Sequence, residues 1–109
     1  MPKRDAVLLV DDMLTAIERI ERYTEGHNRD SFLKAEMAID AVVRNLEIIG
    51  EAARQMPDVF VAQHPEVPWR MIAGLRNRIV HDYFGLDLEI IWQIISQDLR
   101  PLKNQLKAL

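Results

Sequence analysis

Apolar residues recur at spacings of three and four along most of this chain, which is the period of an amphipathic α-helix. The first such segment runs from about Lys3 to Tyr23 and is expected to end at the turn around Gly26. No segment alternates apolar and polar residues with the period of a strand. Four glycines and five prolines in 109 residues leave few interruptions to helix. The sequence therefore predicts an all-α fold.

The second predicted helix is the longest. It is expected to run unbroken from Phe32 to about Gln55, with Asp30 or Ser31 as its N-cap. Its apolar band is wider than a single stripe, so it should have neighbours on two sides. Gly50 lies inside it at a cost of about 1 kcal/mol relative to alanine. The glycine therefore indicates a close approach of another helix.

The second half of the chain contains one short and two main helices. Residues 57–63 can form one or two helical turns, and a proline-rich connector follows. The next helix is expected from about Trp69 to Tyr83, and the last begins at an Asp87 N-cap. Pro101 predicts a kink or a short separate final turn through Leu106. Residues 1–109 thus form a single domain, a bundle of four main helices plus one short helix.

Composition limits the function classes. The net charge of −3 argues against a protein that coats nucleic acid electrostatically, although a few arginines suffice to hold one phosphate. The absence of cysteine excludes disulfides and thiolate metal sites. No secretion signal and no run of about 20 apolar residues is present, so we expect a soluble, cytoplasmic protein without membrane contact.

A dense polar cluster interrupts the third main helix. Between Leu75 and Phe84 it contains two arginines, an asparagine, a histidine, an aspartate and a tyrosine. Such groups destabilise a buried helix unless they find partners, so the cluster is the best candidate for a functional site. On an ideal helix Arg76 and His81 would lie about 140° apart around the axis. Either the reach of the arginine with fraying of the helix end, or a second copy across a two-fold axis, would bring both to one substrate.

The chemistry of these residue types is limited. Arginine holds phosphate by paired hydrogen bonds, and histidine titrates near neutrality and acts as a general base or acid. Arg76 and His81 could together cleave RNA without a metal, as the histidine takes the ribose 2′-hydroxyl proton and the arginine stabilises charge on the phosphate. Asn77 could orient the histidine or a substrate oxygen. Tyr83 could contact substrate or be a target for modification.

Structural roles for the same residues remain open. His81 would gain a favourable dipole interaction near a helix C-terminus. Arg76 and Arg78 could form ion pairs with Asp82, Glu47 or Glu51, and Tyr83 could be a core residue with its hydroxyl at the surface. Glu47 and Glu51 lack an accompanying Glu-x-x-His motif, so a solvated or salt-bridged edge is favoured over a metal site. His27 and His64 are interpreted as loop residues.

The residues Arg76-Asn77-Arg78-Ile79-Val80-His81-Asp82-Tyr83 resemble the Arg-x4-6-His motif of HEPN domains, and more narrowly the R-x4-H-x-Y form of the HepT-like toxin family. The flanking segments 46–53, 64–69 and 83–87 resemble that family as well. The resemblance covers most of the chain, from the second helix to the last, and no motif position departs from it. It implies a HEPN-like helical bundle.

The resemblance also implies a function. HepT-like proteins are metal-independent RNA endonucleases that act as toxins of toxin–antitoxin pairs, without a cofactor. They form homodimers whose composite cleft carries the motif arginine and histidine, here Arg76 and His81. Their partner is an MntA-like nucleotidyltransferase antitoxin that transfers AMP to the motif tyrosine, here Tyr83. Adenylylation would add bulk and negative charge beside Arg76.

Two other functions compete with this one. The chain could be a non-catalytic subunit of a nucleotidyltransferase, in which the Arg76 cleft binds a nucleotide or the partner enzyme. Alternatively, it could be a structural dimerisation module whose polar cluster forms buried ion pairs. Cleavage of RNA in the presence of EDTA, lost in His81→Ala, would separate the nuclease from both.

Overall fold

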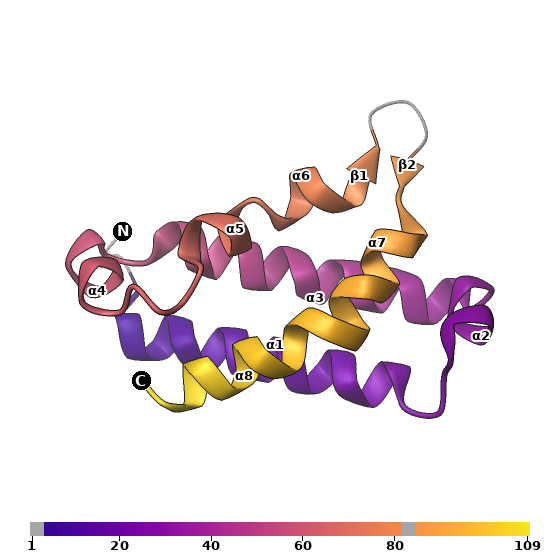
Figure 1. Cartoon of the computed structure of the whole chain (residues 1–109), viewed down its shortest axis with the longest axis horizontal. Helices are drawn as coiled ribbons and strands as arrows, with labels where there is room; N and C mark the ends of the chain where they lie inside the picture. The colour runs from indigo at the N-terminus through magenta and orange to yellow at the C-terminus, as the bar shows by residue number, and fades with distance from the viewer. Residues whose placement is uncertain (1–3, 82–84) are drawn as a thin grey trace.

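Two long antiparallel helices form the centre of the molecule. The computed structural model describes residues 4–81 and 85–109, and of His81 it describes the backbone alone. In it, α1 (Ala6–Thr24) and α3 (Glu36–Gln55) lie side by side (Figure 1). Burial of each large aliphatic side chain between them stabilises the fold by about 1.5–3 kcal/mol. The fully buried residues on the two helices include Met13, Ile17, Ile20, Val42, Leu46 and Ile49.

Shorter helices cover this pair. α5 (Trp69–Ala73) and α6 (Leu75–Ile79) pack on α3 and lie above it in Figure 1, with α1 below. The C-terminal segment comprises α7 (Leu88–Gln93), the π-helical turn η1 (Ile94–Asp98) and α8 (Leu99–Lys107), which packs on α1. The remaining helices are α2 (Arg29–Leu33) and α4 (Asp58–Gln63).

This arrangement confirms the predicted all-α, HEPN-like bundle. The N-terminal helix lies where the periodicity placed it, and Gly26 adopts a φ of 79° in the turn that follows. Asp87 caps α7 as predicted, since its side chain accepts a hydrogen bond from the Ile90 backbone N–H at 3.1 Å. Among the described residues no helix combines the length and apolar character required to cross a membrane.

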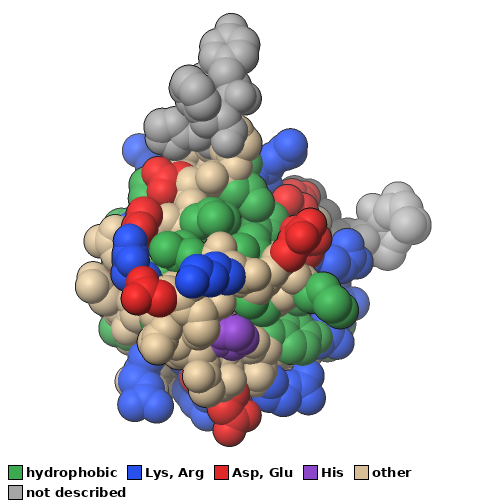
Figure 2. Space-filling view, turned by 90° about the vertical axis from the view of Figure 1, so that its right-hand side faces the viewer, with side chains coloured by type: hydrophobic (Ala, Val, Ile, Leu, Met, Phe, Trp, Pro, Cys, Tyr) green, Lys and Arg blue, Asp and Glu red, His purple; other side chains and the backbone are tan. Residues whose placement is uncertain are grey.

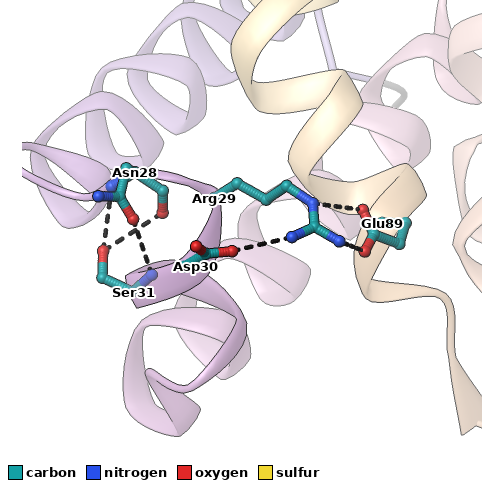
Figure 3. Close-up of polar contacts among 5 residues, drawn as sticks. All are labelled: Asn28, Arg29, Asp30, Ser31 and Glu89. Carbon is teal, nitrogen blue, oxygen red and sulfur yellow. Dashed lines mark hydrogen bonds and ion pairs between the residues drawn. The ribbon is translucent and has the colours of Figure 1, made fainter.

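The prediction of one unbroken helix from Phe32 to Gln55 is wrong. α2 ends at Leu33, and α3 begins afresh at Glu36. The N-cap of α2 is Asn28, in a reciprocal capping box with Ser31, rather than Asp30 or Ser31 itself (Figure 3). The break turns Phe32 into the core, where its ring centroid lies 5.4 Å from that of Trp92 on α7. Tertiary burial of an aromatic side chain thus outweighs helix continuity.

A surface ion pair ties the same short helix to α7. The Arg29 guanidinium donates to both oxygens of the Glu89 carboxylate and also contacts Asp30 (Figure 3). The hydrogen bonds and charge of Glu89 raise the pKa of Arg29. α2 is therefore held to the C-terminal segment by Phe32 inside and by Arg29 outside.

The predicted helix from Trp69 to Tyr83 is also wrong in extent. It is divided at Gly74 into α5 and α6, and it ends at Ile79. The backbone then forms a two-residue antiparallel ladder between β1 (Val80–His81) and β2 (Gly85–Leu86), with Val80 opposite Leu86. Gly85 has a φ of 76°, and the Asp87 N–H donates to the Ile79 carbonyl at 2.7 Å. Tyr83 lies outside the described residues.

Of the two outcomes predicted for Pro101, a kink or a short separate final turn, the structure does not show the separate turn: α8 runs through Pro101 to Lys107. The proline occupies the third position of α8, directly after η1. In that π-helical turn the Leu99 N–H donates to the carbonyl of Ile94, five residues earlier. The wider turn shifts the register so that the residue without an N–H falls in the first turn of α8, where no intrahelical donor is needed.

Gly50 allows α5 and α6 to approach α3 closely, as the sequence predicted. A Cβ atom at this position would lie 3.2 Å from the Ile72 carbonyl oxygen and 3.9 Å from the Leu75 Cβ. The first distance is shorter than ordinary van der Waals contact. A larger side chain here would therefore move the two helices that precede the hairpin.

Gly50→Val is expected to lower the free energy of unfolding by about 1–3 kcal/mol, because its methyl groups would overpack the contact with the Ile72 carbonyl. Gly50→Ala is the matched control, since its single Cβ is partly offset by a gain of about 1 kcal/mol in helix propensity. Urea denaturation followed by circular dichroism measures both. Equal stability of the two variants would contradict the close approach.

Candidate functional site

Arg76 projects from α6 at the edge of an open groove. The groove has a volume of about 290 Å³, and α3 supplies the rest of its lining. Arg76 is exposed, and among the described residues it has neither an ion pair nor a hydrogen bond from its side chain. An unpaired guanidinium in a groove is available to an anionic ligand. The lining residues are Arg44, Leu46, Glu47, Ile48, Gly50, Glu51, Arg54 and Arg76.

Arg78, two residues further on, has a different role. Its Nη1 atom lies 3.1 Å from Asp98 Oδ2 in η1, and its side chain is about one-third exposed. The ion pair joins α6 to the C-terminal segment. Of the structural pairings considered for the two arginines, neither arginine pairs with Glu47 or Glu51, and Asp82 lies outside the described residues. Among the described residues, Arg78 therefore has a structural ion-pair partner and Arg76 has none.

The remaining predicted site residues lie at or beyond the end of α6. Asn77 is exposed on α6. The backbone of His81 lies on β1, paired with Gly85, while its side chain and Tyr83 lie outside the part of the chain that the structure describes. Because the helix ends at Ile79, the 140° separation calculated for a continuous helix does not apply to Arg76 and His81. The catalytic roles of both residues stay a prediction.

The opposite wall of the groove carries charges of both signs. Arg54 pairs with Glu51 at 3.1 Å, and Gln55 donates a further hydrogen bond to Glu51. Of the acidic pair, Glu51 thus has the salt bridge that the sequence favoured. Glu47 and Arg44 make no ion pair with a described residue. The groove lining thus contains three arginines and two glutamates.

Arg44 and Arg54 were not identified from the sequence. Their signal is the spacing of Arg44, Glu47, Glu51 and Arg54 at i, i+3, i+7 and i+10, which places all four on one stripe of α3. That stripe belongs to the candidate site because α6, which carries Arg76, packs beside it on α3. The face around α2 and α7 also carries acidic and basic side chains, and there they surround an apolar area (Figure 2).

His27 and His64 lie in loops, as predicted. His27 Nδ1 is 2.9 Å from Ser31 Oγ, and the His64 ring packs against Phe60 with centroids 4.5 Å apart and ring planes tilted by 45°. The His64 carbonyl also accepts a hydrogen bond from Trp69 Nε1 at 3.0 Å. Neither histidine lines the groove. Both are explained by local packing and hydrogen bonding.

Because Arg78 forms an ion pair and Arg76 has no such partner among the described residues, their substitution should affect stability differently. Arg78→Gln should lower the free energy of unfolding by about 0.5–1 kcal/mol, because it removes a partly exposed ion pair. Arg76→Gln should change it by less than about 0.5 kcal/mol. Asp98→Asn is the control for Arg78, and the double variant should be less destabilised than the sum of the single variants. Additive effects in urea denaturation would contradict the Arg78–Asp98 pair.

Comparison with known proteins identifies relatives over the full chain. The protein named "Putative RNase MJ0127" of Methanocaldococcus jannaschii is 38% identical over 109 residues, covering 100% of this chain and 88% of its own. "Probable ribonuclease HepT" of Thermococcus cleftensis is 38% identical over 107 residues, covering 98% and 97%. "Putative RNase TTE0752" of Caldanaerobacter subterraneus is 36% identical over 100 residues, covering 92% and 89%. No solved structure gives a significant match.

The family comparison agrees with these relatives. The family described as "Ribonuclease HepT-like" matches residues 13–109, which include all of α3, the groove and the C-terminal segment. Together with the arginine–histidine motif at the end of α6, this match shows that the chain belongs to the HepT-like ribonuclease family.

Proposed function

We propose that this protein is a metal-independent RNA endonuclease in which Arg76 and His81 act on one phosphodiester. The observation that carries the proposal is the Arg76 side chain at an open groove, without a partner among the described residues, in a chain that belongs to a ribonuclease family. The alternative interpretation of Arg76 as half of a structural ion pair has no support among the described residues. Arg78 fills the structural role instead.

The proposed reaction uses the ribose as its own nucleophile. His81 takes the proton of the 2′-hydroxyl, and the 2′-oxygen attacks the adjacent phosphorus. The bond between phosphorus and the 5′-oxygen breaks, which leaves a 2′,3′-cyclic phosphate and a 5′-hydroxyl that takes up a proton. Arg76 stabilises the negative charge that builds on the non-bridging oxygens. Asn77, next to Arg76 on α6, supports the site by orienting the histidine or a substrate oxygen.

A homodimer is part of the proposal through family membership. The helical geometry of Arg76 and His81 no longer argues for a dimer, because α6 ends before His81 and the two residues do not share one continuous helix. A two-fold axis near the hairpin would still bring two copies of Arg76 and His81 to one cleft. A protein with two such sites suits a single-stranded or looped RNA, whose bases and backbone are accessible.

We further propose that the nuclease is a toxin controlled in the cytoplasm by an MntA-like nucleotidyltransferase. Transfer of AMP from ATP to the Tyr83 hydroxyl would form a phosphodiester to the tyrosine and release pyrophosphate. The new group carries negative charge and bulk close in sequence to His81 and Arg76, where it would repel the RNA phosphate. In the competing function, a non-catalytic subunit of a nucleotidyltransferase, the Arg76 groove would bind a nucleotide or the partner enzyme without cleaving RNA.

The purified protein is expected to cleave single-stranded RNA in the presence of EDTA. Arg76→Ala and His81→Ala should each reduce the rate by at least about 100-fold, because each removes a group that acts in the transition state. Gel electrophoresis of a labelled RNA measures the rate, and Arg19→Ala, an exposed arginine on α1, is the control. Equal cleavage by wild type and His81→Ala would contradict the assignment. Thermal stabilisation by nucleotides without any cleavage would favour the competing function.

Co-expression with a cognate MntA-like nucleotidyltransferase is expected to add the mass of AMP to the protein. Intact-mass analysis detects the addition, and Tyr83→Phe should abolish it because the acceptor hydroxyl is removed. Tyr23→Phe, at the exposed end of α1, is the matched control and should still be modified. An unchanged mass of the wild type would contradict the modification while leaving the nuclease assignment in place.

A further inference from the structure

We propose that Arg44, on the outer stripe of α3, binds a second RNA phosphate in the groove that holds Arg76. The inference rests on the proposed ribonuclease function and extends it from a reacting phosphate to the path of the strand. Arg44 lies 32 residues before Arg76 in the sequence and belongs to a different helix. The groove is nevertheless lined by both side chains.

The state of the arginines supports this assignment. Arg4, Arg29, Arg54 and Arg78 each form an ion pair with a carboxylate. Arg44 and Arg76 are exposed, and neither has such a partner among the described residues. Other unpaired arginines, such as Arg19 on α1, do not line this groove. Two free guanidinium groups from neighbouring helices can each donate paired hydrogen bonds to phosphate oxygens.

The groove also contains two carboxylates, which affect how strongly it can bind an anion. Glu51 is engaged by Arg54 and Gln55, whereas Glu47 makes no ion pair with a described residue and lies one helical turn from Arg44. Three arginines and two glutamates leave one net positive charge in the lining of a chain whose total is −3. Glu47 should therefore weaken the binding of an anion, and its removal should act opposite to removal of Arg44.

The dimensions of the stripe favour a short single strand. Arg44 and Arg54 are ten residues apart on one helix, a length of about 15 Å along its axis. A strand that follows this stripe can contact both Arg44 and Arg76, because both side chains line the same groove. A duplex is wider and would contact more of the protein surface, where the net negative charge of the rest of the chain would repel it.

Binding of a fluorescently labelled, mixed-sequence single-stranded RNA tests the proposal. Measurements use the full chain with His81→Ala as background, so that the probe is not cleaved. Arg44→Gln is expected to raise Kd about tenfold and to lower the slope of log Kd against log salt by about 0.7, because it removes one arginine–phosphate interaction. Arg44→Lys should restore the slope, because it keeps the charge. Glu47→Gln should lower Kd.

Arg19→Gln is the matched control, because it removes the same charge from an exposed mid-helix position at a different hollow. It should change Kd by less than about twofold. Equal increases of Kd in Arg44→Gln and Arg19→Gln, with both variants as stable as the background in urea, would overturn the proposal and leave the nuclease assignment standing. If the background protein binds no RNA and the wild type cleaves none, both proposals fail together.

Discussion

The close approach between α3 and the α5–α6 segment controls where Arg76 lies relative to the charged stripe of α3. Gly50 makes that approach feasible, because a Cβ atom there would lie 3.2 Å from the Ile72 carbonyl oxygen. Four residues after that carbonyl comes Arg76, which consequently lies beside the charged stripe of α3. The Arg78–Asp98 ion pair fixes the other side of α6 to the C-terminal segment. α6 is thus held between two elements. Of its two arginines, Arg76 lines the groove and has no ion-pair partner among the described residues.

α3 is therefore both the centre of the core and one wall of the site. Its buried side packs on α1 through residues such as Val42, Leu46 and Ile49. Its outer stripe carries Arg44 and Glu47, which have no ion-pair partners among the described residues. Because hydrophobic burial supplies most of the stability, the exposed charges of this stripe contribute little to the fold and can vary without unfolding it.

Helix class and most helix positions could be predicted from sequence because they depend on local periodicity. The limits of α1, the turn at Gly26 and the Asp87 cap all follow from nearby residues. The break before Glu36 could not be predicted, because it accompanies a contact between distant residues, Phe32 with Trp92. The break at Gly74 lies at a glycine, a local signal that the prediction of a continuous helix did not use. The motif identified Arg76 directly. Arg44 could not be identified in this way, because it lines the same groove as Arg76 only once α3 and α6 have packed together.

The end of α6 at Ile79 also bears on how a family can vary its motif. Within a continuous helix, each residue added between arginine and histidine would rotate the histidine by about 100° around the axis. In this chain only part of the four-residue interval is helical, and the rest leads into the β1–β2 hairpin. A strand such as β1 can absorb an extra residue before the histidine as a bulge. The variable spacing of the HEPN motif is thus compatible with a constant site, because the histidine is positioned by a hairpin and not by helical phase.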